Sequence, residues 1–254
     1  MTLISLMMKY RDPDFPPKAE TSGQLTLIPL VEGSIYPEGS RSSPPTADES
    51  RETRGGPSWR KTKSSMLNKP HLKQVLRKLK SKSRPDQLAG MARFGISAEK
   101  RLGVSVPELR KLAKEIGKDH ALALKLWQTE ISDAMILASM IDDPVEVTDK
   151  QMELWAADFN SWDVCDQTCM NLFDKVPFVT KKIKAWAKRK EEFVKRAAFA
   201  LIASISCHDK NLPDNKFSEL LQIIKKSSTD ERNYVRKAVN WALRNIGKRN
   251  ANLN

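Results

Sequence analysis

Apolar residues recur at helical spacing through almost all of the chain after residue 65, and no convincing alternating strand pattern accompanies them. In the segment 105–117, Leu109, Leu112 and Ile116 share one face, and Gly117 ends the pattern. Further helical patterns follow at about residues 119–129, 132–141, 148–158, 161–175, 180–188, 191–206, 214–226 and 230–248. The pattern predicts an all-α protein.

The order and length of these helices suggest a repeat architecture. Ser105 and Glu108 have the spacing of a capping box, which fixes the start of the first clear helix. Short connections join helices of similar length, and a two-helix unit recurs about every 35 to 45 residues. This is typical of a HEAT-like or armadillo-type helical repeat solenoid. An irregular globular bundle is the alternative, because no clean sequence repeat is visible.

Residues 1–65 differ from the rest of the chain. They hold 8 of its 14 prolines and show neither helical nor strand periodicity, which predicts a disordered Pro-rich extension. The opening residues are mildly apolar, but no basic region precedes them, so we do not expect a secretory signal. Met66 directly precedes the first helical pattern and is a candidate alternative start. Residues 66–254 form the predicted HEAT-like domain.

The charge of the chain indicates its class of partner. There are 44 Lys and Arg residues against 31 Asp and Glu residues, a net charge of +13, and +12 of this falls on residues 66–254. Such an excess predicts a polyanionic partner, with nucleic acid favoured over an anionic membrane surface.

Two absences in the sequence narrow the class of protein. No uncharged apolar run reaches the length of about 18 residues that a membrane helix needs, so we expect no membrane partner. Three cysteines cannot form a disulfide framework in a chain this long, and their odd number suits a reducing compartment. We therefore expect a cytoplasmic protein, nucleoid-associated if its source is prokaryotic.

The segment 160–169 is the most informative for chemistry. On a helix that begins near its start, Cys165 and Cys169 point close to the direction of Trp162. Asp166 lies about 40° from that direction, at the edge of an apolar face. A carboxylate beside a tryptophan is partly desolvated there, so its charge acts more strongly on a nearby cation than in water. The alternative is an ion pair between Asp166 and a lysine at a helix contact.

Two positions later in the chain complete the candidate site. Arg196 stands at the foot of the apolar helix segment 197–202, where a guanidinium on a rigid element can reach a phosphate or a carboxylate. Trp241 lies on an amphipathic last helix with basic residues along one side. Taken alone, Arg196 is more often a salt-bridge residue and Trp241 more often a core residue.

Basic residues gather in two parts of the sequence, between Lys181 and Arg196 and between Lys225 and Arg249. In a helical solenoid such residues can line a concave surface whose curvature suits a DNA backbone, although a solvated helix face is the alternative for any one of them. The predicted DNA-binding residues are Arg196, Lys195, Lys188, Arg189, Lys190, Arg236, Lys237 and Arg244.

A zinc site is not expected. Cys165 and Cys169 lack the usual paired spacing of zinc ligands and lie on an apolar face, where small buried thiols are common. The sequence also lacks a Walker A loop, a dinucleotide fingerprint and a Ser/His/Asp triad pattern. We therefore expect no metal and no cofactor.

Four positions taken together resemble the AlkD-like DNA alkylation repair proteins, HEAT-like-repeat glycosylases that remove N3- and N7-alkylated purines. These positions are Trp162, Asp166, Arg196 and Trp241. The resemblance covers most of residues 66–249, including the stretches 94–96, 103–110 and 236–244. Residues 1–65 have no counterpart in it, and Asp163 and the two helix cysteines make the site helix more acidic and richer in sulfur than the family pattern requires.

The resemblance implies roles for these residues. Trp162 and Trp241 would be aromatic walls beside the lesion, Asp166 the essential carboxylate and Arg196 a phosphate contact. The implied activity is that of a monofunctional glycosylase of the 3-methyladenine and 7-methylguanine type. It would act on double-stranded DNA through phosphate and sugar contacts, without base flipping, and we expect it to be a monomer.

The chemistry of alkylated purines agrees with this set of residues. A cationic alkylpurine is already a good leaving group, so the enzyme mainly has to stabilise the sugar cation. A carboxylate about 4 Å from that cation contributes on the order of 4 kcal/mol at an effective dielectric constant near 20, roughly a thousandfold in rate. Each tryptophan face adds about 0.5 to 2 kcal/mol through cation–π attraction.

Two other classes of function remain open. A non-catalytic DNA-binding HEAT-repeat module would keep the basic surface and lose nothing when Asp166 becomes Asn. An armadillo-type protein-interaction scaffold would bind an acidic peptide, and modest salt would abolish its weak affinity for DNA.

Overall fold

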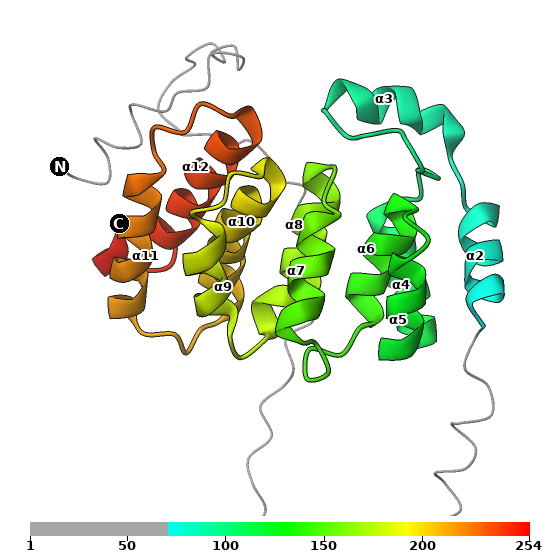
Figure 1. Ribbon diagram of the computed structural model, residues 1–254, viewed down its shortest axis with the longest axis horizontal. Coiled ribbons are helices and arrows are strands. Elements are labelled where there is room, and N and C mark those ends of the chain that lie inside the picture. The colour runs from blue at the N-terminus through cyan, green and yellow to red at the C-terminus, as the bar shows by residue number, and fades with distance from the viewer. Residues whose placement is uncertain (1–70) are drawn as a thin grey trace, which may run out of the picture. The chain divides into compact units, whose positions relative to one another are not determined.

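The computed structural model describes residues 71–254, so the predicted extension 1–65 and the first residues of the predicted domain lie outside the described residues. Within the described part, the chain forms eleven α-helices, three short 3-10 helices and no strand (Figure 1). The all-α prediction is confirmed. The elements are α2 (Leu72–Ser81), η1 (Pro85–Gln87), α3 (Leu88–Arg93), α4 (Val106–Ile116), α5 (His120–Trp127), α6 (Ser132–Ile141), α7 (Asp149–Ala157), α8 (Trp162–Asn171), η2 (Phe173–Lys175), α9 (Val179–Trp186), α10 (Glu192–His208), α11 (Asp214–Lys226), α12 (Asn233–Gly247) and η3 (Ala251–Leu253).

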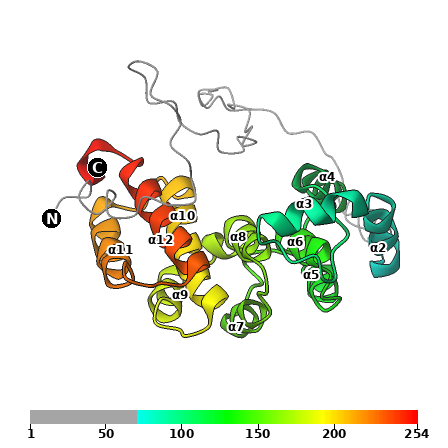
Figure 2. The same ribbon diagram turned by 90° about the horizontal axis from the view of Figure 1, so that it is seen from above.

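The helices from α4 to α12 pack in two layers (Figure 2). The even-numbered helices α4, α6, α8, α10 and α12 lie side by side in one layer, and α5, α7, α9 and α11 lie in the other (Figures 1 and 2). Helix α10 is apolar over nearly its whole length because α8, α9 and α12 all pack against it. This two-layer stacking is the arrangement expected of a helical repeat protein.

The repeat is shorter than the predicted 35 to 45 residues. Thirty residues separate the first residue of α6 from that of α8, and thirty again separate α8 from α10. The expected spacing was wrong for these units because α7 and α9 have only 9 and 8 residues. The step from α10 to α12 is 41 residues, since α10 itself has 17.

Aromatic side chains join successive repeats through the core. The rings of Trp127 and Trp155 stack with their centroids 3.8 Å apart and their planes 5° apart. Phe173 continues the row, with ring centroids 6.1 Å from Trp155 on one side and 6.1 Å from Trp186 on the other. These rings come from α5, α7, η2 and α9, so their contacts connect each repeat to the next one.

One predicted helix cap and one predicted helix boundary need correction. Ser105 does precede α4, but its side chain makes no capping bond, and the carboxylate of Glu108 instead pairs with the Lys82 ammonium group. A tertiary ion pair therefore replaces the predicted capping box. The helix predicted over 161–175 breaks at Leu172, where φ is −132° and ψ is −59°, and it continues as η2.

The loop between α3 and α4 runs along the amino-terminal ends of the even-numbered helices. The Ser132 N–H, at the start of α6, donates to the carbonyl of Lys100. The buried Asp133 carboxylate accepts the N–H groups of Leu102 and Val104 at 2.6 and 2.7 Å. These bonds fix the end of the loop on α6, and hydrogen bonds from Trp162 and Tyr234 hold its earlier part near the starts of α8 and α12.

Candidate functional site

Helix α8 begins with an ion pair that anchors it to the α3–α4 loop. The guanidinium of Arg101 contacts both carboxylate oxygens of Asp163, at 3.0 and 2.8 Å, and its Nε donates to the carbonyl of Ser97. The Ser161 hydroxyl donates to the same carboxylate at 2.5 Å. Asp163 is therefore fully engaged in holding the loop on the helix.

One turn further along α8, Asp166 forms a second bidentate pair, with Arg196 on α10. Arg196 Nε donates to Oδ1 at 2.9 Å, and Nη2 donates to Oδ2 at 2.7 Å. The two side chains are only 12% and 7% exposed, so the pair is shielded from water. The structure thus joins two predicted site residues directly, and the partner of Asp166 is an arginine rather than the lysine of the alternative reading.

Arg196 makes two further contacts. Its Nη1 donates to the backbone carbonyl of Tyr234 at 2.7 Å, and its Cζ lies 5.9 Å from the centroid of the Trp162 ring. Three of its five N–H donors are used by Asp166 and Tyr234, which leaves two for another acceptor. Arg196 therefore orients the carboxylate, and its role as a phosphate contact stays a prediction.

The electrostatics of the pair follow from its burial. Burial raises the pKa of Asp166, and the neighbouring Arg196 charge and hydrogen bonds oppose that rise. Desolvation acts to lower the pKa of Arg196, but the Asp166 carboxylate outweighs it and raises that pKa overall. The guanidinium therefore stays charged, and its two hydrogen bonds fix the orientation of the Asp166 carboxyl group.

The structure adds Phe94 and Gly95, at the end of α3, to this site. The indole Nε1 of Trp162 donates to the Phe94 carbonyl at 3.0 Å, and the Tyr234 hydroxyl donates to the Gly95 carbonyl at 3.2 Å. The Phe94 side chain is 76% exposed. In the sequence, residues 94–96 were noted only as part of the family resemblance, and Phe94 and Gly95 were not predicted as site residues. The signal that could have indicated them is an aromatic residue directly before a glycine, in a stretch without acidic residues.

Trp241 lies two helical turns beyond Tyr234 on α12. Its side chain is half-buried and packs against the hydrophobic core. Within residues 71–254, no hydrogen bond or ring contact joins it to Trp162, Asp166 or Arg196. Its proposed role beside the lesion stays a prediction.

The remaining predicted DNA-binding residues fall into two groups. Arg189 pairs with Glu191 and Glu153, and Lys195 pairs with Asp230 at 2.9 Å. For the others, the structure gives no ion pair within the part of the chain that it describes. Lys188, Lys190, Lys237 and Arg244 are exposed, and Arg236 is half-buried.

The two helix cysteines serve the packing of α8 on α10. The thiols of Cys165 and Cys169 point to the carbonyls of Phe193 and Ala197, at 3.6 and 3.7 Å. Burial raises the pKa of Cys169 well above its ordinary value, which keeps it a neutral thiol. Among the described residues, no group of three potential metal ligands lies close together.

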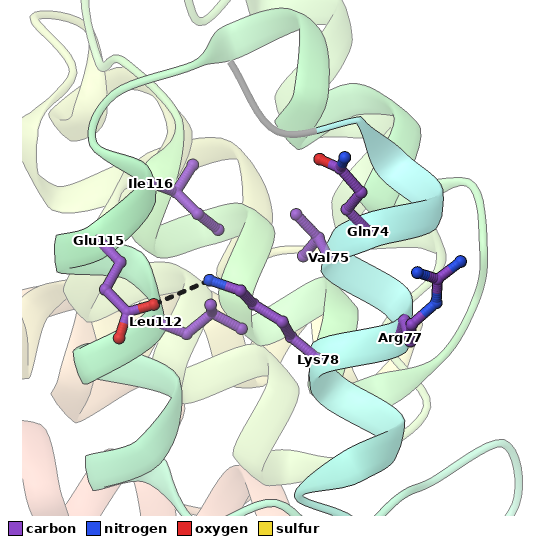
Figure 3. Close-up of a pocket in the computed structure, with 7 residues that line it drawn as sticks. All are labelled: Gln74, Val75, Arg77, Lys78, Leu112, Glu115 and Ile116. Atoms are coloured by element: carbon purple, nitrogen blue, oxygen red, sulfur yellow. Dashed lines mark hydrogen bonds and ion pairs between the residues drawn. The ribbon is translucent and has the colours of Figure 1, made fainter. Parts of the chain in front are cut away.

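A pocket of about 300 Å³ lies between α2 and α4, away from these residues (Figure 3). Val75, Leu112 and Ile116 form its apolar wall, and an ion pair of 3.0 Å between Lys78 and Glu115 spans it. Because both charged side chains are about half exposed, this pair contributes little to stability.

Comparisons with known proteins agree with this architecture. The model of the DNA alkylation repair enzyme family matches residues 75–254. Two proteins described as uncharacterized, from Listeria monocytogenes and Listeria innocua, are each 25% identical over 141 residues, or 54% of this chain and 61% of the relative. The match thus spans less than two thirds of those relatives.

A solved structure shows a similar fold, with a TM-score of 0.63 and 19% identity over 70% of this chain and 76% of that chain. It is described as a new family of proteins related to the HEAT-like repeat DNA glycosylases, with affinity for branched DNA structures. The predicted HEAT-like fold is therefore confirmed. In residues 71–254, no helix combines the length and the apolar character needed to span a membrane. Since the family model covers well over half of the sequence, the chain belongs to the DNA alkylation repair enzyme family.

Proposed function

We propose that this protein is a monofunctional DNA glycosylase that hydrolyses the N-glycosidic bond of cationic N3- and N7-alkylated purines in double-stranded DNA, without base flipping. The observation that carries the proposal is the Asp166 carboxylate, which Arg196 holds in a fixed orientation beside Trp162. Asp166 would stabilise the sugar cation and orient the attacking water. Trp162, Trp241 and Phe94 would contact the damaged nucleotide.

The location of the pair supports DNA as the ligand. Asp166 and Arg196 lie in the second turns of α8 and α10, and Trp162 and Tyr234 lie in the first turns of α8 and α12. Helix amino termini carry partial positive charge and free N–H groups, so they favour phosphate. Exposed basic residues such as Lys190, Arg93 and Lys237 lie on neighbouring segments. The site therefore combines one buried carboxylate with a positively charged edge that suits a DNA backbone.

The ion pair changes the expected size of the catalytic effect. A carboxylate about 4 Å from the sugar cation contributes about 4 kcal/mol at an effective dielectric constant near 20, and a guanidinium about 4 Å farther away cancels about half of this. The net effect of about 2 kcal/mol corresponds to roughly 30-fold in rate. The loss on removing Asp166 is therefore expected between about 30-fold and a thousandfold. The lower limit applies if Arg196 stays in place, and the upper limit if it turns to a phosphate.

Base release from methylated duplex DNA tests the proposal. The full chain is expected to release 7-methylguanine and 3-methyladenine, and Asp166→Asn is expected to lose this activity while retaining DNA binding. Asp163→Asn is the matched control, because Asp163 lies on the same helix and has its own bidentate arginine. Equal loss in both variants would indicate disturbance of α8 or of the loop that Asp163 holds, rather than removal of a catalytic group.

A non-catalytic DNA-binding function is the second candidate. It is favoured by the pairing of both Asp166 carboxylate oxygens with Arg196 and by the solved structural neighbour, which is described as having affinity for branched DNA structures. On this reading neither the parent nor Asp166→Asn releases base, and both bind DNA with a steep salt dependence. Affinities for a four-way junction and for a linear duplex of the same strands, measured at equal salt, test this candidate directly.

A further inference from the structure

The turn at Phe94 and Gly95 lies close to the ring of Tyr234. Gly95 has φ of +70°, and a Cβ atom placed on it would lie 2.1 Å from the Tyr234 hydroxyl oxygen and 3.2 Å from Cζ. Only glycine fits this approach without a shift of the ring, and it also adopts this φ without strain. The contact joins residues 139 positions apart in the sequence, so it is a tertiary contact of the loop with α12.

The same tyrosine also contacts the buried ion pair. Its backbone carbonyl accepts a hydrogen bond from Arg196 Nη1 at 2.7 Å, while its hydroxyl donates to the Gly95 carbonyl at 3.2 Å. Its ring packs against Phe193, with centroids 5.3 Å apart. Tyr234 is therefore connected to both halves of the candidate site, the Asp166–Arg196 pair and the turn that carries Phe94.

Few other contacts hold the Phe94–Gly95 turn against the rest of the protein. Helix α3, which precedes it, has no buried residue. Arg101, which Asp163 holds on α8, donates to the Ser97 carbonyl two residues after Gly95, and the anchors at Lys100 and Leu102 lie five or more residues after Gly95. At Phe94 and Gly95 themselves, the links to the helices are the side-chain hydrogen bonds that Trp162 and Tyr234 donate.

We propose that Tyr234 is a positioning residue whose hydroxyl holds the Phe94–Gly95 turn over the Asp166–Arg196 pair, so that Phe94 is presented to the DNA at a fixed place. The inference rests on the proposed function, because it assumes that this site meets DNA. Loss of the hydroxyl leaves the α12 backbone and the ring in place. It releases the turn, and with it the carbonyl that accepts the Trp162 N–H.

The indole N–H of Trp162 gives a readout that does not depend on activity. In the full chain its NMR signal is assigned by comparison with Trp162→Phe, and its exchange with solvent reports opening of the turn. Tyr234→Phe is expected to increase this exchange about fivefold, the loss that one hydrogen bond of about 1 kcal/mol corresponds to. Ser206→Ala, which removes a buried hydroxyl bond elsewhere on α10, is the control and leaves the exchange unchanged.

A double-variant cycle tests whether the glycine and the tyrosine act together. Gly95→Ala in the parent forces the turn away from the hydroxyl, so Trp162 N–H exchange rises more than tenfold. In the Tyr234→Phe background the 2.1 Å clash is absent, and the nearest ring atom lies at 3.2 Å. The double variant is therefore expected to exchange no faster than Gly95→Ala alone.

The outcomes separate this proposal from the glycosylase proposal. Unchanged Trp162 exchange in Tyr234→Phe overturns the positioning role, whatever the activity. Faster exchange supports it, even if the parent releases no base and the glycosylase proposal fails. Where the parent is active, Tyr234→Phe should lower the rate of base release about fivefold and change the affinity for undamaged duplex less than twofold. A parental release rate in this variant shows that the turn does not position Phe94 for the reaction.

Discussion

Asp166 and Arg196 occupy the same place in successive repeats, since each is the fifth residue of its helix and they lie 30 residues apart. Other side-chain bonds between neighbouring units have nearly the same separation. Asp174 and Ser204 are 30 positions apart, and the Cys169 thiol meets a carbonyl 28 positions later. The buried pair is therefore a product of the repeat register. Any change that shifts α10 against α8 separates the carboxylate from the guanidinium.

Breaking the pair from one side should destabilise the protein strongly. Arg196→Met leaves the Asp166 carboxylate buried without its partner and is expected to lower the free energy of unfolding by about 3 to 5 kcal/mol. The double variant Asp166→Leu with Arg196→Met removes both charges, so it should be more stable than Arg196→Met alone. Urea denaturation of the full chain measures both changes.

An exposed pair provides the comparison for that experiment. Lys78 and Glu115 are about half exposed, so Lys78→Met is expected to change the free energy of unfolding by less than about 1 kcal/mol. The buried charges would not be the cause of the loss if the Asp166→Leu, Arg196→Met double variant lost as much stability as Asp166→Leu and Arg196→Met lose together when each is measured alone.

The sequence pattern predicted the layers and most of the site helix because both depend on local periodicity. Helical spacing predicted that Asp166 lies about 40° from Trp162 around the helix axis, at the edge of an apolar face. In the structure Asp166 is buried on α8, next to apolar residues of that helix. Local periodicity could not predict that Arg196 is the partner of Asp166. This pairing depends on the 30-residue repeat between α8 and α10, and the longer step of 41 residues from α10 to α12 obscures that repeat in the sequence.

Contacts between residues that are distant in sequence could not be predicted from local sequence patterns. Glu108 follows the capping-box rule in sequence but pairs with Lys82 in the structure, because Lys82, the residue that follows α2, comes within reach of α4. The contact of Gly95 with Tyr234 joins residues 139 positions apart. Periodicity carries no information about such a contact, and a glycine with positive φ has no distinct signal in one sequence.

The salt dependence of DNA binding should separate the unpaired basic residues from the paired ones. Lys190→Ala removes an exposed charge for which the described residues give no ion pair, so it is expected to reduce the slope of log K against log salt concentration by about 1. Arg189→Ala removes a charge already paired with Glu191, so the slope should change less. Fluorescence anisotropy with one duplex at several salt concentrations measures both. Equal slopes for the two variants would contradict the assignment.

Phe94 should matter for the reaction and not for folding. Its side chain is 76% exposed, so Phe94→Ala is expected to change the free energy of unfolding by no more than about 0.5 kcal/mol. Loss of stacking on a base or sugar costs about 1 to 3 kcal/mol, so the rate of base release should fall by between about fivefold and about 150-fold. Leu154→Ala, at a 57% exposed apolar residue on α7, should leave both quantities unchanged.

Arg249 holds the connection between α10 and α11. Its guanidinium donates to four backbone carbonyls, including those of Asp209 at 2.6 Å and Leu212 at 2.7 Å, and its Cζ lies 4.5 Å from the Phe217 ring centroid. Arg249→Met leaves these carbonyls without their donor and is expected to lower the free energy of unfolding by about 2 to 4 kcal/mol. Lys248→Met, at the neighbouring exposed position, should change it little. Thermal unfolding of the two variants distinguishes these effects.

The pH dependence of base release tests the charge state of Asp166. Burial raises the pKa of Asp166, so the ionised form is lost at a higher pH than for an ordinary aspartate as the solution is acidified. If the anion stabilises the sugar cation, kcat/KM should fall as pH falls through this raised pKa. The Asp163 charge contributes to the rise, so Asp163→Asn should lower the pKa of Asp166 and move the acidic limb to lower pH. If the acidic limb of the kcat/KM profile lies at the same pH in Asp163→Asn as in the parent, another group is responsible for the titration. An unfolding curve measured at each pH separates titration of the site from acid denaturation.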